Sequence, residues 1–165
     1  MSSILKVDTI QNSSGTTGLT VDNSGRVLNP NAIAWFLNKT SSQTASGGDE
    51  LVTWDVVKLN QGGGFQTSGG NANKFVAPVH GIYSSGGTLL TTNDGNDHDI
   101  KLFHNSTAVV RVRPAQSSGH ESFTFSWVGE MNANDTLHLA IVTSGRILYG
   151  DTSIYWTNWH GHFIG

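Results

Sequence analysis

The sequence predicts an all-β protein built as a sandwich or barrel. Gly, Ser, Thr and Asn supply 69 of the 165 residues, and these residue types favour strands and turns over helices. Short runs in which apolar and polar residues alternate are separated by turn signals such as Asn93-Asp-Gly95 and Ser144-Gly145. Charged residues make up only 13%, whereas a helical bundle or coiled coil would be rich in Glu, Lys, Ala and Leu.

Charge and composition exclude several classes of function. The net charge of −3 lacks the clustered Lys and Arg that nucleic-acid binding needs. The absence of cysteine excludes disulfides, thiolate zinc sites and a cysteine nucleophile. No apolar run approaches the length of about 18 residues that spans a membrane, and the first residues lack the apolar core of a signal peptide. We therefore expect a chain made in the cytoplasm, whose Asn-x-Ser/Thr sequons carry no glycan.

Residues 1–30 differ from the rest and are expected to form an extended attachment or oligomerisation arm before a head domain over residues 31–165. The arm has no aromatic residue, and Pro30 between two asparagines marks its end. Its β-prone runs, Leu5–Ile10 and Leu19–Asp22, have too little apolar bulk to close a core of their own. We therefore expect sister chains or a partner to order the arm. The residues expected to make this attachment are Ile4, Leu5, Val7, Ile10, Leu19 and Val21.

Several stretches of the head alternate apolar and polar residues with a period of two, which predicts half-buried strands. In chain order they are Val110–Arg113, Phe123–Trp127, Leu137–Ile141 and Tyr155–Phe163. Pro114 is expected to end the first of them. The stretch Leu51–Leu59 is ambiguous, because its apolar residues also fit one face of a helix.

The most specific feature of the head is a motif of aromatic residues at fixed spacing. It reads Trp54-x5-Asn60-x4-Phe65-x9-Phe75-x5-Gly81-x-Tyr83. Pro78 cannot donate to a strand ladder and Gly81 relieves a tight entry, so together they predict that Tyr83 begins a strand. The motif resembles the signature of the globular head of complement component C1q, in the tumour-necrosis-factor-like superfamily.

Two later stretches extend this resemblance to about residues 33–165. Asn134–Leu139 resembles the family's Gly-Asp-x-Leu-x-Leu strand, and Trp159–Ile164 resembles its closing Phe-x-Gly-Phe-Leu. The sequence departs from the family at Ser84–Gly87, where the family has aromatics. The resemblance implies a ten-stranded jelly roll that forms a homotrimer and buries aromatics on a three-fold axis. The fold and trimer core would then comprise Trp54, Phe65, Phe75, Pro78, Gly81, Tyr83, Phe123, Phe125, Trp127, Trp159 and Phe163.

The N-terminal segment carries a second resemblance. Ser3–Gly15 is similar to the opening of virion structural proteins of tailed phages, notably marine and cyanobacterial ones. The resemblance implies that this segment serves attachment and precedes a fibre or head domain.

The densest acidic stretch, Asn93–Asp99, offers oxygen ligands at alternate positions, which suits calcium. It lacks the downstream bidentate Glu of a calcium loop, so a solvated turn is the favoured interpretation. Two of its residues, Asp97 and Asp99, remain candidate ligand-binding residues.

Arg111 and Arg113 point the same way from one predicted strand and are also candidate ligand-binding residues. They could pair with carboxylates such as Glu121 or Glu130, or bind an anionic glycan, and structural pairing is favoured. His160 and His162 alternate on the last strand as a metal pair would. No third or fourth ligand can be named, so surface or interface histidines are expected and no metal or other cofactor is assigned.

No catalytic motif is present: Gly62-Gly-Gly64 lacks the Gly-Lys-Ser/Thr of a phosphate loop, and no Gly-x-Ser-x-Gly elbow occurs. The leading hypothesis is a non-enzymatic structural protein of a tailed-phage virion, a trimeric knob or capsid decoration (cement) protein. Its arm would bind other capsid or tail proteins. The alternative is the receptor- or glycan-binding head of a short tail fibre, with exposed aromatics in a groove beside Asp97, Asp99 or Arg111.

Overall fold

The computed structural model describes residues 7–93, 98–113 and 119–165, and the chain divides into two compact units, 1–32 and 33–165. Apart from one 3₁₀ turn, η1 (Gly69–Asn71), all regular structure in the described ranges is strand, which confirms the predicted all-β class. In this part of the chain, no helix has the length and hydropathy needed to span a membrane. Ile4, Leu5, Asp97 and Pro114, which the sequence singled out, lie outside the described residues.

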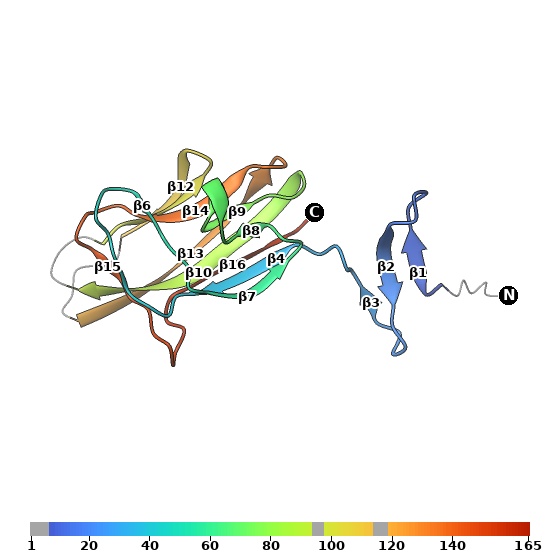
Figure 1. Cartoon of the computed structure of the whole chain (residues 1–165), viewed down its shortest axis with the longest axis horizontal. Coiled ribbons are helices and arrows are strands. Elements are labelled where there is room, and N and C mark those ends of the chain that lie inside the picture. Colours follow the sequence, from blue (N-terminus) through green and yellow to red (C-terminus); the bar gives the residue numbers. More distant parts are fainter. Residues whose placement is uncertain (1–6, 94–97, 114–118) are drawn as a thin grey trace. The chain divides into compact units, whose positions relative to one another are not determined.

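The first unit contains a small antiparallel sheet of three strands in the order β1 (Thr9–Gln11), β2 (Thr17–Val21) and β3 (Val27–Leu28) (Figure 1). No residue from Val7 to Asn31 is buried within the chain. This agrees with the expectation that the segment cannot close a core of its own. The expectation of a single extended arm is wrong, because the chain folds back on itself twice here.

The two reversals repeat one local turn, Asn12–Gly15 and Asp22–Gly25. In each turn the Oδ1 atom of the first residue accepts hydrogen bonds, 2.9–3.0 Å long, from the backbone N–H groups two and four residues later. The closing glycines have φ values of 80° and 78°, in the left-handed region that favours glycine. Short-range turn chemistry thus shapes the segment without help from a core.

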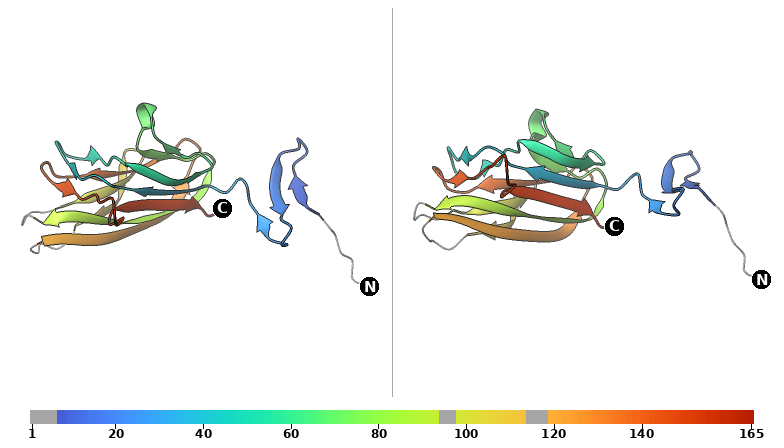
Figure 2. Two further views of the ribbon diagram at one scale, coloured as in Figure 1. Left: turned by 60° about the horizontal axis from the view of Figure 1, so that its bottom comes forward. Right: turned by 90° about the horizontal axis from the view of Figure 1, so that it is seen from below.

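The second unit, the head, is a sandwich of two sheets that form separate layers (Figures 1 and 2). The first, the β10 sheet, has the order β13 (Gly119–Met131), β10 (Gly81–Asn93), β16 (Asn158–Phe163), β4 (Ala34–Asn38) and β7 (Val56–Gln61), with β15 (Ile147–Leu148) and then β5 (Gln43–Thr44) pairing onward from β10. The second, the β11 sheet, has the order β12 (Thr107–Val112), β11 (Ile100–His104), β14 (Thr136–Ile141), β9 (Lys74–Val76) and β8 (Phe65–Gln66), with β6 (Glu50–Leu51) on β14. The described part of the head thus has thirteen strand segments, some of only two residues, and the number of ten stays a prediction.

The alternating stretches form strands β12, β13, β14 and β16, as their period predicted. In β13, Phe125 is buried and Phe123 and Trp127 pack against the core, while the residues between them are exposed. The ambiguous stretch Leu51–Leu59 contains parts of β6 and β7 and no helix. One detail is wrong: Tyr155 precedes β16 and is 41% exposed, because the chain leaves the sheet in a loop before that strand.

Aromatic rings fill the space between the two sheets. Trp35 stacks on Phe75 with ring centroids 3.9 Å apart, and Trp159 meets Trp35 edge-on at 5.7 Å. Six of the eleven residues expected in the fold and trimer core are buried aromatics of this layer, and three more pack against it. The six are Trp54, Phe65, Phe75, Tyr83, Phe125 and Trp159, and the three are Phe123, Trp127 and Phe163. The six buried aromatics are thus enclosed by the two sheets of one chain, and the burial of aromatics on a three-fold axis stays a prediction; Pro78 is exposed.

Side-chain hydrogen bonds explain the spacing of the motif. Asn60 bridges the turn to Phe65: its Nδ2 donates to the Phe65 carbonyl at 3.0 Å, and its Oδ1 accepts from the Phe65 N–H at 2.9 Å. Gly81 opens β10 with a φ of +152°, and a Cβ there would lie 2.5 Å from Phe163 Cε2. Tyr83 follows in the strand, as predicted, and its hydroxyl donates to the Val79 carbonyl at 2.8 Å.

Within Ser84–Gly87, where the sequence departs from the family, the inward-facing Ser85 and Gly87 make room for Trp159. The Trp159 indole N–H donates to the Ser85 hydroxyl at 2.8 Å within the core. A Cβ on Gly87 would overlap the Asn158 carbonyl and lie 3.2 Å from Trp159 Cα. The aromatic bulk absent from β10 is thus supplied by β16.

We predict that Gly161→Ala destabilises the head by about 3 kcal/mol, since overpacking this site displaces the Trp35 ring and the adjoining backbone. A Cβ at this position would overlap the Trp35 ring and lie 2.5 Å from the Ser84 carbonyl oxygen. Urea denaturation measures the loss. Gly47→Ala is the matched control, because its Cβ meets nothing within 4 Å, and it should change stability by no more than about 0.5 kcal/mol. Equal stabilities for the two variants would contradict the packing described.

Candidate functional site

The charged residues singled out by the sequence form a structural cluster at one end of the β11–β12 hairpin. Asp99 is 1% exposed, and its Oδ1 atom accepts a hydrogen bond from Arg113 Nε at 2.6 Å. Its Oδ2 atom accepts from Arg113 Nη2 at 2.8 Å and from both Nε, at 3.0 Å, and Nη2 of Arg111. Asp99 therefore cannot serve as an open ligand-binding carboxylate.

The expectation that these arginines are paired structurally is met, with Asp99 as the partner. Hairpin register is the reason: Ile100 pairs with Val112, so the residue before β11 meets the arginines on either side of Val112. The hydrogen bond from Arg113 is the main influence that lowers the pKa of Asp99 to about 2, with Arg111 adding to it against the effect of burial. Glu130, one of the partners considered, instead lies 2.8 Å from His80 Nε2.

His160 and His162 lie on the outward face of β16, as the alternation predicted. Burial, and secondarily the neighbouring His162, lower the pKa of His160. Within the described residues of one chain, no group of three or more His, Cys, Asp or Glu side chains is placed to hold a metal ion.

The head has a pocket of about 410 Å³ at a place that the sequence did not indicate. Three segments form it: the late part of β10, the start of β13 and the connection from β15 to β16. Its lining residues are Leu90, His120, Ser122, Tyr149, Asp151 and Trp156. The pocket combines aromatic rings, a carboxylate and neutral polar groups, a combination typical of small-molecule sites.

The pocket lies at the end of the β10 sheet opposite the point where the chain enters the head. β4 begins at Ala34, which pairs with His162, beside the Gly81 end of β10. Leu90 pairs with Ser122 near the far end of β10. The run of β10 and β13 between these two ends can be followed in Figure 1.

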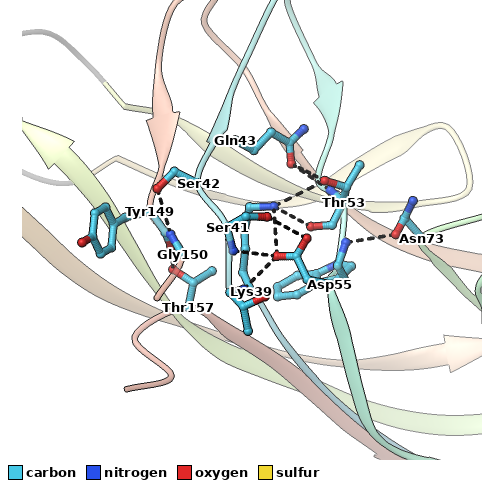
Figure 3. A network of polar contacts seen from close by, with 12 residues as sticks. Lys39, Ser41, Ser42, Gln43, Thr53, Asp55, Asn73, Tyr149, Gly150 and Thr157 are labelled. Carbon is cyan, nitrogen blue, oxygen red and sulfur yellow. Dashed lines mark hydrogen bonds and ion pairs between the residues drawn. The ribbon is translucent and has the colours of Figure 1, made fainter. Parts of the chain in front are cut away.

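The loop that carries Tyr149, Asp151 and Trp156 is anchored at both ends. Thr157 Oγ1 donates to the Tyr149 carbonyl at 2.6 Å and accepts from the Leu90 N–H at 3.1 Å. The Gly150 N–H donates to Ser42 Oγ at 3.2 Å (Figure 3). These bonds fix the loop against β10 and against the Ser41–Ser42 turn.

A network of polar contacts around Asp55 and the buried Lys39 holds the Ser41–Ser42 turn in place (Figure 3). Asp55 Oδ2 accepts from the backbone N–H groups of Thr40 and Ser41 at 2.8 and 2.9 Å, and Oδ1 accepts from the Ser41 hydroxyl at 2.9 Å. Partial burial raises the pKa of Asp55, but these bonds and the nearby Lys39 outweigh that effect and lower it. Lys39 is 1% exposed and donates from Nζ to the Thr53 carbonyl at 2.8 Å, and burial lowers its pKa.

The aromatic-rich stretch Tyr149–Trp156 was the available sequence signal for this pocket. It combines three aromatic residues with Gly150 and Asp151 between two strands. Sequence reasoning assigned Tyr155 to the last strand and so missed the loop. The contribution of Leu90, His120 and Ser122 depends on strand pairing and has no local signal.

Known proteins share the architecture of the head. The family model for the C1q domain matches residues 34–164. A search of curated proteins gave no match. Among solved structures, the globular domain of zebrafish complement 1qA protein is similar with a TM-score of 0.64 and 13% identity, over 81% of this chain and 98% of that one.

Two further solved structures are similar to a comparable extent. Murine APRIL has a TM-score of 0.62 and 14% identity, over 81% of this chain and 99% of its own. The Eiger TNF of S. frugiperda has a TM-score of 0.61 and 10% identity, over 81% and 93%. At these identities the likeness shows the fold alone, and it confirms the expected jelly-roll class.

We predict that Asp99→Asn destabilises the head by about 2 kcal/mol, because it leaves two arginines short of their carboxylate. Asp49→Asn is the matched control: Asp49 pairs with Lys101 at the surface and should lose less than about 1 kcal/mol. Urea denaturation at neutral pH measures both variants.

The same substitution changes the acid limb of the stability curve. The folded-state pKa of Asp99, about 2, lies below its ordinary value of 3.8, so its stabilisation is complete above about pH 4 and is lost as the pH falls toward 2. The free energy of unfolding of Asp99→Asn should therefore fall less steeply than that of the wild type between about pH 4 and pH 2. An unchanged acid limb in the variant would contradict a structural role for the carboxylate.

Proposed function

The chain belongs to the C1q domain family, and on that basis we propose that it acts as a non-enzymatic, homotrimeric structural protein of a virion surface. C1q- and TNF-like domains typically form homotrimers and are generally non-enzymatic. In this role the jelly-roll head forms a trimeric knob or capsid decoration, and the N-terminal unit attaches it to other virion proteins. The single observation that carries it is a central band without charged residues on the outward face of the β10 sheet.

Two rows of paired residues cross the centre of this outward face. They are Val128, Ser84, His162, Ala34 and Gln61 in one row, and Ser126, Gly86, His160, Phe36 and Leu59 in the other. Neither row contains Asp, Glu, Lys or Arg, and β16 is the middle strand of the five. Val128 is 63% exposed and Leu59 42%. Removing water from this uncharged band costs little free energy, which favours its contact with copies of itself around a three-fold axis.

We predict that Val128→Glu reduces the mass in solution from about 53 kDa, three copies of 17.6 kDa, to that of one chain. A buried, unpaired carboxylate at such a contact is strongly unfavourable. Light scattering measures the mass. Val109→Glu is the matched control, since Val109 is an exposed valine on β12 of the other sheet, and it should leave a trimer. A wild-type monomer would overturn the trimer proposal.

The N-terminal sheet supports an attachment role because one of its faces is apolar and uncovered. Register puts Ile10 opposite Leu19 and Val21 opposite Val27, and these four side chains share a face. Val27 is 65% exposed and Ile10 55%. We propose that this face packs on another virion protein, in keeping with the resemblance of the first residues to phage virion proteins.

We predict that deleting residues 1–30 leaves a folded head that no longer attaches to virus particles. The head contains all of the described buried hydrophobic residues, so its core is intact without them. Val27→Lys should weaken co-sedimentation with the particles more than Leu28→Lys, because Leu28, 46% exposed, lies on the opposite face. Full attachment of the truncated protein would show that the head, not this segment, binds the particle.

A second candidate function is a receptor-binding head of a short tail fibre. The pocket in the head favours it, because aromatic rings beside a carboxylate and neutral polar groups are typical of ligand-binding sites. In this candidate function the binding site is formed by residues other than those expected from the sequence. Asp99 and its two arginines are engaged with one another, and the pocket lies among Tyr149, Asp151 and Trp156 instead.

A further inference from the structure

The lining of the pocket divides into an apolar part and a polar part. Leu90, Tyr149 and Trp156 supply apolar surface, and His120, Ser122 and Asp151 supply hydrogen-bonding groups. Trp156 is 44% exposed, so its ring is accessible to a ligand in the pocket. The pocket thus places the face of an aromatic ring next to hydrogen-bonding groups.

Asp151 lines the pocket and is held in position through one of its two oxygens. Its Oδ1 atom accepts from the Ser153 N–H at 2.7 Å, the Ser153 hydroxyl at 2.6 Å and the Ile154 N–H at 3.1 Å. Its Oδ2 atom accepts no hydrogen bond from the described residues. The bonds from Ser153, and then that from Ile154, lower the pKa of Asp151, so at neutral pH it is an acceptor without a proton.

The neutral polar groups of the pocket can both donate and accept. The His120 ring meets the Tyr149 ring edge-on, with centroids 5.0 Å apart, which limits its rotation. The Ser122 hydroxyl turns freely and can serve either role. This mixture matches hydroxyl groups, which also donate and accept.

From these contacts we infer that the pocket binds a neutral saccharide. This inference rests on the second candidate function, that of a receptor-binding head. A sugar ring presents a C–H face that stacks on Trp156, and hydroxyls that donate to Asp151 and exchange hydrogen bonds with His120 and Ser122. The volume of about 410 Å³ lies within the usual range of small-molecule sites. The anchored loop presents these groups without a large ordering cost, which favours affinity.

A quaternary ammonium group is the competing ligand class, because aromatic rings beside a carboxylate also bind cations. The polar groups disfavour it: donors such as the Ser122 hydroxyl have no acceptor on a trimethylated nitrogen. The quaternary nitrogen would also offer no hydrogen-bonding partner to the His120 ring. Choline chloride is therefore the probe that separates the two classes.

The experiment titrates the full-length protein with D-glucose, D-galactose, D-mannose and N-acetyl-D-glucosamine up to about 50 mM, followed by tryptophan fluorescence and saturation-transfer NMR. We expect saturable binding of at least one sugar, weakened about tenfold or more by Trp156→Ala. Asp151→Asn keeps an Oδ1 acceptor for the turn and should weaken binding about three- to tenfold. Tyr155→Ala is the matched control. Its ring lies under Lys58 Nζ, 4.8 Å away, and does not line the pocket, so binding should not change.

The outcomes separate this inference from the function on which it rests. No saturable binding of any of the four sugars, equal binding by Trp156→Ala and wild type, or binding of choline alone would overturn the saccharide assignment. Whole-cell binding that Trp156→Ala abolishes, without sugar binding, would leave the receptor-binding candidate standing and this inference wrong. Sugar binding without cell binding would support the site and overturn the receptor role. Circular dichroism confirms that each variant is folded.

Discussion

The burial of Trp159 between the two sheets is the interaction on which the rest of the head depends. Its indole is fully buried, donates to Ser85 and packs against Trp35, Trp54 and Phe65. Because side chains alternate along a strand, seating Trp159 inward turns His160 and His162 outward, onto the face proposed for the trimer. One ring thus determines both the core and the orientation of the middle strand.

The same strand connects the core to the pocket. Thr157 comes directly before β16, is fully buried and ties the end of the pocket loop to Tyr149 and Leu90. The buried carboxylate of Asp99 and the half-buried one of Asp151 differ in their hydrogen bonds. Asp99 has both oxygens engaged by arginines, whereas Asp151 has one oxygen fixed by its own turn and lines a pocket. The former stabilises a hairpin, and the latter can meet a ligand.

Sequence reasoning succeeded where local patterns carry the information. The alternation in Phe123–Trp127 and the aromatic motif around Gly81 identified strands, inward faces and the C1q-type jelly roll. It predicted that Arg111 and Arg113 are paired but did not name Asp99 as their partner, since that pairing depends on hairpin register. It failed for Tyr155. The alternation assigned to the last strand begins at Tyr155, whereas the strand itself begins only at Asn158. The roles in a virion and the trimer remain proposals.

The sequence by itself determined the all-β class, the inward faces of the strands and the turn chemistry of Asn12 and Asp22, because these depend on neighbouring residues. Only the tertiary structure decided which carboxylate is buried and where a pocket opens. Leu90, His120 and Trp156 come from separate segments, and only the pairing of β10 with β13 and the anchoring of the loop before β16 bring them together. Contacts between residues far apart in the chain have no local signature, since each depends on the register of the whole sheet.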